Sequence, residues 1–180
     1  MTYPPDAPFE PHDRHEVFRG RLLSLNLERW PGGEREVVHH PGACAIVALP
    51  DDDDVILVRQ LREAVRRRLL EIPAGILDVD GERDADCAAR ELFEETGYRA
   101  SEVEPLTTIL TSPGFADERI ALYLARAEPA DGPGEEGVEV VRMQLERAVT
   151  LIDTGEIVDA KTVTGLLLAT ARRGGFVSRT

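Results

Sequence analysis

The first half of the chain is dominated by segments with the apolar patterns of β-strands. The run EVFRGRLLSLNLERW alternates imperfectly between apolar and polar residues, and REVVHHPG follows it after the turn PGGE. These two runs predict an antiparallel hairpin over residues 15–42. The runs ACAIVALP and VILVRQLRE are apolar at nearly every position, as buried strands often are. LLEIPAGILDVDGE then predicts a short strand that leads into a glycine-containing loop.

The second half combines helical and strand patterns. Apolar residues at helical spacing predict a helix from about residue 85 to 96, with Asp84 as its N-terminal cap and Gly97 as the residue that ends it. VEPLTTILTS, RIALYLARA and VEVVRM predict strands, whereas LERAVTLIDTG and AKTVTGLLLATARR predict helices. This order of elements predicts an α/β fold in which one sheet is sandwiched between helices.

Composition restricts the size of the fold and the partners of the protein. A chain of 180 residues, 42% of them hydrophobic, can bury one sizeable core and is short for two full domains. Its 34 Asp and Glu residues outnumber its 21 Lys and Arg residues, which gives a formal net charge of −13. Because nucleic-acid binding requires a basic surface, we expect no nucleic-acid partner. If the substrate is itself an anion, a divalent cation must mediate its binding.

Cysteine placement and the N-terminal sequence predict an intracellular protein. Cys44 and Cys87 lie in an apolar run and in a helical pattern, which predicts buried thiols rather than a disulfide. The N-terminus lacks the basic start and apolar stretch of a secretory signal, and there is no apolar run long enough to span a membrane. We therefore expect a cytoplasmic location and no membrane partner. The acidic run Asp51–Asp54 predicts a solvated turn rather than a metal site.

The predicted helix gathers several acidic side chains. With about 100° between successive residues, one face carries the residues that we expect to pack on the core, namely Ala85, Ala88, Ala89, Leu92 and Thr96. Glu91, Glu94 and Glu95 share a neighbouring arc, also about 100° wide, in which we expect no basic side chain. Arg90 points elsewhere, where it can pair with Glu82. Mg²⁺ takes oxygen ligands, so this arc predicts either a divalent cation site or simply an acidic exposed face.

The string from Gly75 to Tyr98 resembles the Nudix box of the Nudix hydrolases, a family that cleaves nucleoside diphosphates linked to another moiety. The family pattern is a glycine, five residues, a glutamate, seven residues, and then Arg-Glu-apolar-any-Glu-Glu-any-Gly-apolar. Glu82 stands eight positions before Arg90, and RELFEETGY fits the rest. One departure is that six residues, not five, separate Gly75 from Glu82. The resemblance implies the Nudix fold, a mixed β-sheet between helices (α/β/α), with the hairpin as an N-terminal extension.

Outside the box, IPAG before it and SPGFADE after it are similar to the ADP-ribose pyrophosphatase branch of this family. The resemblance extends from about Val17 to about Leu168. Members of that branch are typically homodimers in which N-terminal strands help to build the partner's substrate site. The resemblance therefore implies a dimerising strand region over 15–42 and a Nudix hydrolase domain over 43–174. Residues 1–14, with four prolines among polar residues, predict a flexible leader.

The resemblance also implies metal ligands. Glu91 and Glu95 are expected to be the principal Mg²⁺ ligands, with Mn²⁺ or Zn²⁺ as substitutes for Mg²⁺. Glu94 is expected to bind a metal directly or through water, and the backbone carbonyl of Ala74 is expected to complete a site. In the loop GEEGVEVV, Glu136 is expected to be the general base or a further metal ligand.

The same comparison implies catalytic residues. Glu135 is the alternative to Glu136 as the loop base, because the two are adjacent. Glu136, Glu95 and Arg90 then form the expected catalytic set. Hydrolysis of a pyrophosphate requires an activated water, a base for its proton and positive charge near the phosphates, and this set together with a divalent cation can supply all three.

Substrate contacts are implied at five positions. Arg35 and Arg62 match positions where the branch places basic residues on the diphosphate or adenosine part of the substrate, although each is equally compatible with a surface strand position. Gly114 and Phe115 would let the backbone approach the terminal ribose, and Glu118 would accept hydrogen bonds from its hydroxyls. A plain turn is the alternative interpretation of SPGFADE.

The resulting functional hypothesis is Mg²⁺-dependent hydrolysis of ADP-ribose to AMP and ribose 5-phosphate. GDP-mannose or another nucleoside diphosphate sugar is the nearest alternative substrate. A module that senses a nucleotide without turning it over is a second hypothesis, and the complete set of helical glutamates speaks against it. Isomerase chemistry on an allylic diphosphate is a third, for which the two cysteines offer no supporting context.

Overall fold

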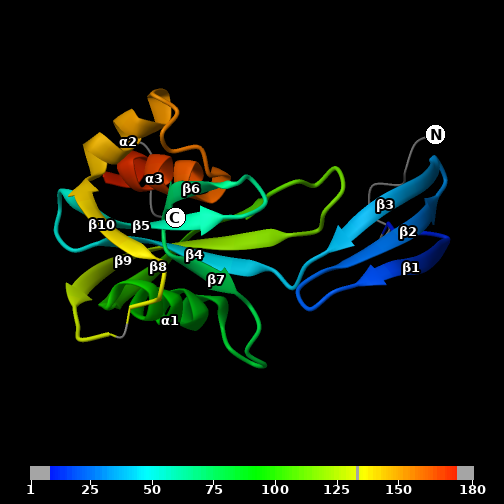
Figure 1. Ribbon diagram of the computed structural model, residues 1–180, viewed down its shortest axis with the longest axis horizontal. Helices are drawn as coiled ribbons and strands as arrows, with labels where there is room; N and C mark the ends of the chain where they lie inside the picture. The colour runs from blue at the N-terminus through cyan, green and yellow to red at the C-terminus, as the bar shows by residue number, and fades with distance from the viewer. Residues whose placement is uncertain (1–8, 133, 174–180) are drawn as a thin grey trace. The chain divides into compact units, whose positions relative to one another are not determined.

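The computed structural model describes residues 9–132 and 134–173 and divides the chain into two compact units (Figure 1). The first unit contains the chain up to Pro41 together with Ser112–Glu118, and the second contains Gly42–Thr111 and the chain from Arg119 onward. Most of the predicted leader, residues 1–8, lies outside the described residues. Its last two positions, 13 and 14, belong to the first strand.

The first unit contains a three-stranded antiparallel sheet instead of the predicted two-stranded hairpin. Its strands are β1 (Asp13–Arg19), β2 (Ser24–Trp30) and β3 (Gly33–His39), in the order β1-β2-β3. The run predicted as one long strand is interrupted by a tight turn, in which the Gly20 amide donates to the Leu23 carbonyl over 2.8 Å. The imperfect alternation of that run was the sign of this break.

The second unit contains a mixed sheet. The order along its main path is β10-β5-β4-β9-β8, and the short strands β6 and β7 pair with β5 and β4. Strands β4 and β9 run parallel, and the other pairs are antiparallel. The strands are β4 (Ala43–Leu49), β5 (Asp54–Arg62), β6 (Arg67–Glu71), β7 (Ala74–Ile76), β8 (Tyr98–Leu110), β9 (Arg119–Pro129) and β10 (Glu139–Gln144).

Helices cover both faces of this sheet. Helix α1 (Asp84–Thr96) lies on one face, whereas α2 (Leu145–Asp153) and α3 (Ala160–Arg173) lie on the other (Figure 1). Side chains alternate along β4: Ile46 packs in the cluster that includes α1, and Val47 packs in the cluster that includes α2 and α3. All seven residues of β4 are therefore buried, which explains its unbroken apolar sequence. The predicted α/β/α arrangement is confirmed.

The segment LLEIPAG forms two strands rather than the predicted one. Strand β6 ends at Glu71 and β7 begins at Ala74, so Ile72 and Pro73 separate them. Proline has no amide hydrogen for a ladder, although its carbonyl accepts from the Ile46 amide over 3.0 Å. The chain therefore changes its partner strand at this point, from β5 to β4.

The N-terminal cap predicted for α1 is wrong, whereas its predicted end is confirmed. Asp84 is the first residue of the helix, the cap position is Arg83, and no side chain bonds there. The Asp84 carboxylate instead accepts a 2.8 Å hydrogen bond from Arg119 on β9. Gly97 ends the helix with a φ of 74°, a left-handed conformation that favours glycine.

Two surface features of the sequence have defined places in the second unit. The aspartates of the turn 51–54 are not simply solvated, because Arg142 bonds to Asp51 and Asp54 and Arg126 bonds to Asp52. Cys44 and Cys87 are fully buried free thiols, as predicted. Within the described residues, no helix is both long and apolar enough to cross a membrane.

Packing of α3 on the sheet depends on Gly165. A Cβ atom at this position would lie 2.9 Å from Val47 Cγ2 and 3.1 Å from Ile72 Cδ1. We therefore expect Gly165→Val to lower the free energy of unfolding by about 1–3 kcal/mol through overpacking, as measured by urea denaturation. Leu167→Val, at a side chain that is 47% exposed on the same helix, is the control and should change little. Equal effects of the two substitutions would contradict this packing.

Candidate functional site

The three clustered carboxylates of α1 differ strongly in burial. Glu95 is only 4% exposed and belongs to the buried face of the helix, together with the fully buried Cys87, Ala88 and Leu92. The side chains of Glu91 and Glu94 are 16% and 50% exposed. The sequence placed all three beside the core face, and the structure turns one of them into it.

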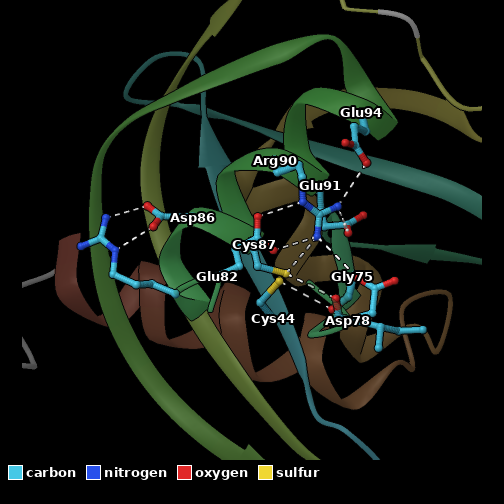
Figure 2. Close-up of polar contacts among 11 residues, drawn as sticks. Cys44, Gly75, Asp78, Glu82, Asp86, Cys87, Arg90, Glu91 and Glu94 are labelled. Atoms are coloured by element: carbon cyan, nitrogen blue, oxygen red, sulfur yellow. Dashed lines mark hydrogen bonds and ion pairs between the residues drawn. The ribbon is translucent and has the colours of Figure 1, made fainter. Parts of the chain in front are cut away.

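Arg90 organises the acidic side chains around it (Figure 2). Its Nε and Nη2 atoms donate to the two carboxylate oxygens of Glu82, each over 3.0 Å, so the predicted pair is confirmed. Its Nη1 atom also donates to Glu91 over 2.6 Å and to Glu94 over 3.2 Å. The expectation that no basic group reaches the acidic arc is therefore wrong, because the arginine side chain is long enough to bend back over it.

The loop between β7 and α1 accommodates its extra residue. Glu82 still reaches Arg90 from the end of this loop, and the hydrogen bond from Arg90 lowers the pKa of the Glu82 carboxyl. The chain turns at Gly81, which has a φ of 79°. The longer spacing after Gly75 therefore does not disturb the pair that holds the loop on the helix.

Gly75 allows the Glu91 carboxylate to lie directly against β7. A Cβ atom at this position would be only 1.9 Å from Glu91 Cδ, so no larger residue fits. Burial at this contact raises the pKa of the Glu91 carboxyl, although Arg90 opposes the shift. The glycine that opens the box motif thus provides the space for a carboxylate of the same motif.

Glu95 lies beside the same strand. Its Oε2 atom accepts a 3.2 Å hydrogen bond from the Ala74 amide. Burial raises the pKa of the Glu95 carboxyl from its ordinary value of 4.5 to about 8, the charges of Glu91 and Glu135 add to this rise, and the Ala74 amide and Arg62 oppose it. A buried carboxylate with nearby negative charge is stabilised when a cation binds to it.

These groups suit a hard divalent cation, although they do not form a compact ligand cluster. Glu91 and Glu95 meet β7 at Gly75 and Ala74, and their carboxylates offer the oxygen ligands that Mg²⁺ prefers. Among the described residues, no group of three or more His, Cys, Asp or Glu side chains has the geometry of a metal site. Glu91 and Glu94 are instead directed to Arg90 (Figure 2).

The loop glutamates differ in their influence on Glu95. Both Glu135 and Glu136 are exposed. The charge of Glu135 contributes to the raised pKa of Glu95, which places Glu135 within electrostatic reach of the helix carboxylates. The sequence favours Glu136 as the loop base, with Glu135 as the alternative.

The predicted substrate residues are distributed over both units. Arg62 lies in the second unit, where its charge acts on Glu95 and its Nε and Nη2 atoms bond to Glu71 over 2.8 and 2.6 Å. Arg35 is exposed on β3 of the first unit and donates to the Glu34 carbonyl over 2.8 Å. The structure therefore brings Arg62, but not Arg35, into the same unit as the carboxylates.

Gly114, Phe115 and Glu118 belong to the segment of the first unit between β8 and β9. The Phe115 side chain is 58% exposed, while its carbonyl accepts from the Val38 amide over 2.8 Å. Glu118 lies 3.7 Å from His40 Nδ1. A β-bridge between Val38 and Ala116 ties this segment to β3, so it is more ordered than a plain turn.

Sequence reasoning missed two buried charged residues near the site. Glu71 is fully buried at the end of β6, and Lys161 is 7% exposed at the start of α3. Their ammonium and carboxylate groups bond to each other. A signal existed, since a glutamate within the apolar run LLEIPAG had to be either exposed or paired.

The family model described as NUDIX domain matches residues 38–166. An ADP-ribose pyrophosphatase of Bacillus subtilis (strain 168) is 40% identical, over 83% of this chain and 85% of that protein. A GDP-mannose pyrophosphatase of Citrobacter koseri (strain ATCC BAA-895 / CDC 4225-83 / SGSC4696) is 37% identical, over 79% and 83%. The crystal structure of an ADP compounds hydrolase aligns with a TM-score of 0.76 and 24% identity, over 93% and 96% of the two chains, and shows that the fold is shared.

The burial of Glu95 predicts a pH-dependent stability. Between about pH 5 and 8 the folded protein holds the Glu95 proton that the unfolded chain has released, so the wild type loses stability as the pH rises. Glu95→Gln removes this titration, and its melting temperature in a metal chelator should increase relative to wild type across that interval. Glu94→Gln, at a half-exposed carboxylate, is the control and should show a smaller trend. A difference that stays constant with pH would contradict the burial.

Proposed function

Because the chain belongs to the NUDIX domain family, we propose that it hydrolyses the pyrophosphate bond of ADP-ribose, giving AMP and ribose 5-phosphate. The observation that carries this proposal is the meeting of Glu91 and Glu95 with β7, where two carboxylates of α1 lie beside one short strand. The likeness to the pyrophosphatase of Bacillus subtilis supports ADP-ribose as the substrate.

The carboxylates of Glu91 and Glu95, with the carbonyl of Ala74, would hold Mg²⁺, or Mn²⁺ or Zn²⁺ in its place. Glu94, which is half exposed, would take part directly or through water. A divalent cation bound there would neutralise phosphate charge and make a water more acidic. The raised pKa of Glu95 supports this assignment, because a buried carboxylate near other negative charges gains most from a cation.

The remaining roles belong to charged side chains of the second unit. Arg90 would fix Glu91 and Glu94 relative to the loop through its bonds to Glu82. Arg62 would contact the diphosphate, since one edge of its guanidinium is fixed on Glu71 and its side chain is 40% exposed. We propose Glu135, in place of Glu136, as the base that takes the proton of the attacking water.

In a homodimer, the first unit of one protomer would help to build the substrate site of its partner. Strand β1 is exposed along its whole length, and the apolar side chains Val17, Phe18 and Leu22 near it are 46%, 56% and 43% exposed. Exposed apolar groups of this kind mark interaction surfaces. Arg35, Gly114, Phe115 and Glu118 would then contact the nucleoside diphosphate sugar. The cytoplasmic location stays a prediction.

GDP-mannose is the second candidate substrate, because a GDP-mannose pyrophosphatase is also similar over most of this chain. The chemistry at the diphosphate would be unchanged, and only the contacts to the base and the sugar would differ. A nucleotide-sensing module without turnover remains the alternative from another class. Retention of Glu91, Glu94 and Glu95 together speaks against it.

Product analysis tests the proposed activity. Incubation of the protein with ADP-ribose and Mg²⁺ should release AMP and ribose 5-phosphate, detected by chromatography. Glu95→Gln is the matched variant, and we expect it to lose at least about a hundredfold in kcat while keeping a cooperative melting transition. Release of product from GDP-mannose but not from ADP-ribose would exclude ADP-ribose as the substrate. Full activity of Glu95→Gln would exclude Glu95 as a metal ligand.

The two loop glutamates give a paired test of the base. Glu135→Gln should lower kcat by about a hundredfold or more with little change in KM, as expected for loss of a proton acceptor. Glu136→Gln is its neighbouring control and should stay within about threefold of wild type. Steady-state kinetics with ADP-ribose measures both variants. If Glu136→Gln shows the large fall instead, the register favoured by the sequence is correct and our assignment of Glu135 is wrong.

A further inference from the structure

Arg62 belongs to a network of charged groups that extends into the interior of the second unit. Glu71, which is fully buried, accepts two hydrogen bonds from Arg62 and another from Lys161. Lys161 also lies 3.0 Å from Asp159. The network joins β5, β6 and the start of α3, and it contains two cations and two anions. Its charges therefore balance inside the fold, as buried charges must.

The geometry fixes which edge of Arg62 is free. Its Nε and Nη2 atoms are both used by Glu71, which holds the planar guanidinium in one orientation. No acceptor among the described residues bonds to the third nitrogen, Nη1. The side chain is 40% exposed, and the charges of Arg62 and Glu95 act on each other. The free edge is thus available to an anionic ligand of the carboxylate site.

Helix α3 connects this network to β7. Asp159 accepts hydrogen bonds from the Thr162 amide over 3.0 Å and from its hydroxyl over 2.6 Å, which caps the helix. The same hydroxyl accepts from the Ile72 amide over 3.0 Å. Ile72 directly follows Glu71, which accepts hydrogen bonds from Arg62. Two positions after Ile72, the Ala74 amide donates to Glu95. The first turn of α3 therefore holds the segment 71–74, which contacts both Arg62 and Glu95.

We infer that Lys161 and Glu71 are positioning residues that hold Arg62 on the diphosphate of the substrate. This inference rests on the proposed function, since it assigns to Arg62 a ligand in the same site. Neither Lys161 nor Glu71 would touch the substrate. They would act by keeping the Nε and Nη2 edge of Arg62 occupied and the Nη1 edge free.

Removal of the Lys161 charge would change the position of Arg62. Without the ammonium group, two carboxylates, Glu71 and Asp159, would share a single cation. The charge of Asp159 already acts on Arg62, so the guanidinium would be drawn between the two acids and away from the ligand. The substrate would then bind more weakly, whereas the carboxylates of α1 would keep their places.

Binding measurements on Lys161→Met and Glu71→Gln test this inference. Calorimetry with ADP-ribose and Ca²⁺, which takes the same oxygen ligands as Mg²⁺, gives the dissociation constant without relying on turnover. We expect each variant to weaken binding about tenfold, close to the effect of Arg62→Met, with kcat in Mg²⁺ reduced by less than about threefold. Two variants are used so that one remains informative if the other fails to fold.

Coupling to Arg62 separates positioning from a general loss of stability. Addition of Lys161→Met to Arg62→Met should weaken binding no further, because both act through one guanidinium. Leu166→Ala is the control for stability: it removes fully buried apolar atoms from the same helix, leaves every charge of the network in place, and should lower the melting temperature with less than about twofold effect on binding.

Three results would overturn the inference: unchanged binding in Lys161→Met and Glu71→Gln, an equal loss of binding in Leu166→Ala, or a full additional loss in the double variant. A failure of the proposed function is distinguishable from these results. It would appear as absence of AMP release by the wild type in Mg²⁺, whereas the inference depends only on ratios of dissociation constants among variants.

Discussion

The contact between helix α1 and strand β7 is the constraint on which the site depends. Glu91 lies against Gly75, and Glu95 accepts from the Ala74 amide, so two carboxylates are held beside one short strand. Burial of charge is normally unfavourable, and here it raises the pKa of both carboxyls. A site of this kind attracts a cation more strongly than three exposed glutamates would.

Positive charge balances this arrangement from two directions. Arg90 comes from the helix itself and bonds to three glutamates, which also fastens the preceding loop to α1. Arg62 comes from β5 and is fixed by Glu71 and, through it, by Lys161. Arg90 thus bonds to the acidic side chains of α1 and of the loop, whereas Arg62 is held by Glu71 on the sheet. Under the proposed function, these two arginines would place positive charge near an anionic substrate in a strongly acidic chain.

The segment between β6 and β7 joins these features. It changes partner strand at Ile72 and Pro73, and it carries Glu71 before that change and Ala74 after it. Helix α3 holds its middle through Thr162 and its start through Lys161. A short irregular stretch of chain therefore links the C-terminal helix to the carboxylates on the opposite face of the sheet.

The sequence by itself determined the layers of the second unit, the end of α1 at Gly97, the buried thiols and the pairing of Arg90 with Glu82. These features depend on local spacing, which a linear pattern records. It did not predict the third strand of the first unit, the capping of α1, the bonds from Arg90 to Glu91 and Glu94, or the ion pairs of the turn 51–54. Each of these depends on which side chains meet across the fold.

The burial of Glu95 and the pairing of Glu71 with Lys161 show this division most clearly. A helical wheel placed Glu95 at the edge of the core face, but only the packing of α1 on β7 decided that it is buried. Glu71 and Lys161 are 90 positions apart in the chain. Their contact exists because α3 packs over the junction of β6 and β7, and only the tertiary structure brings such distant charges within bonding distance.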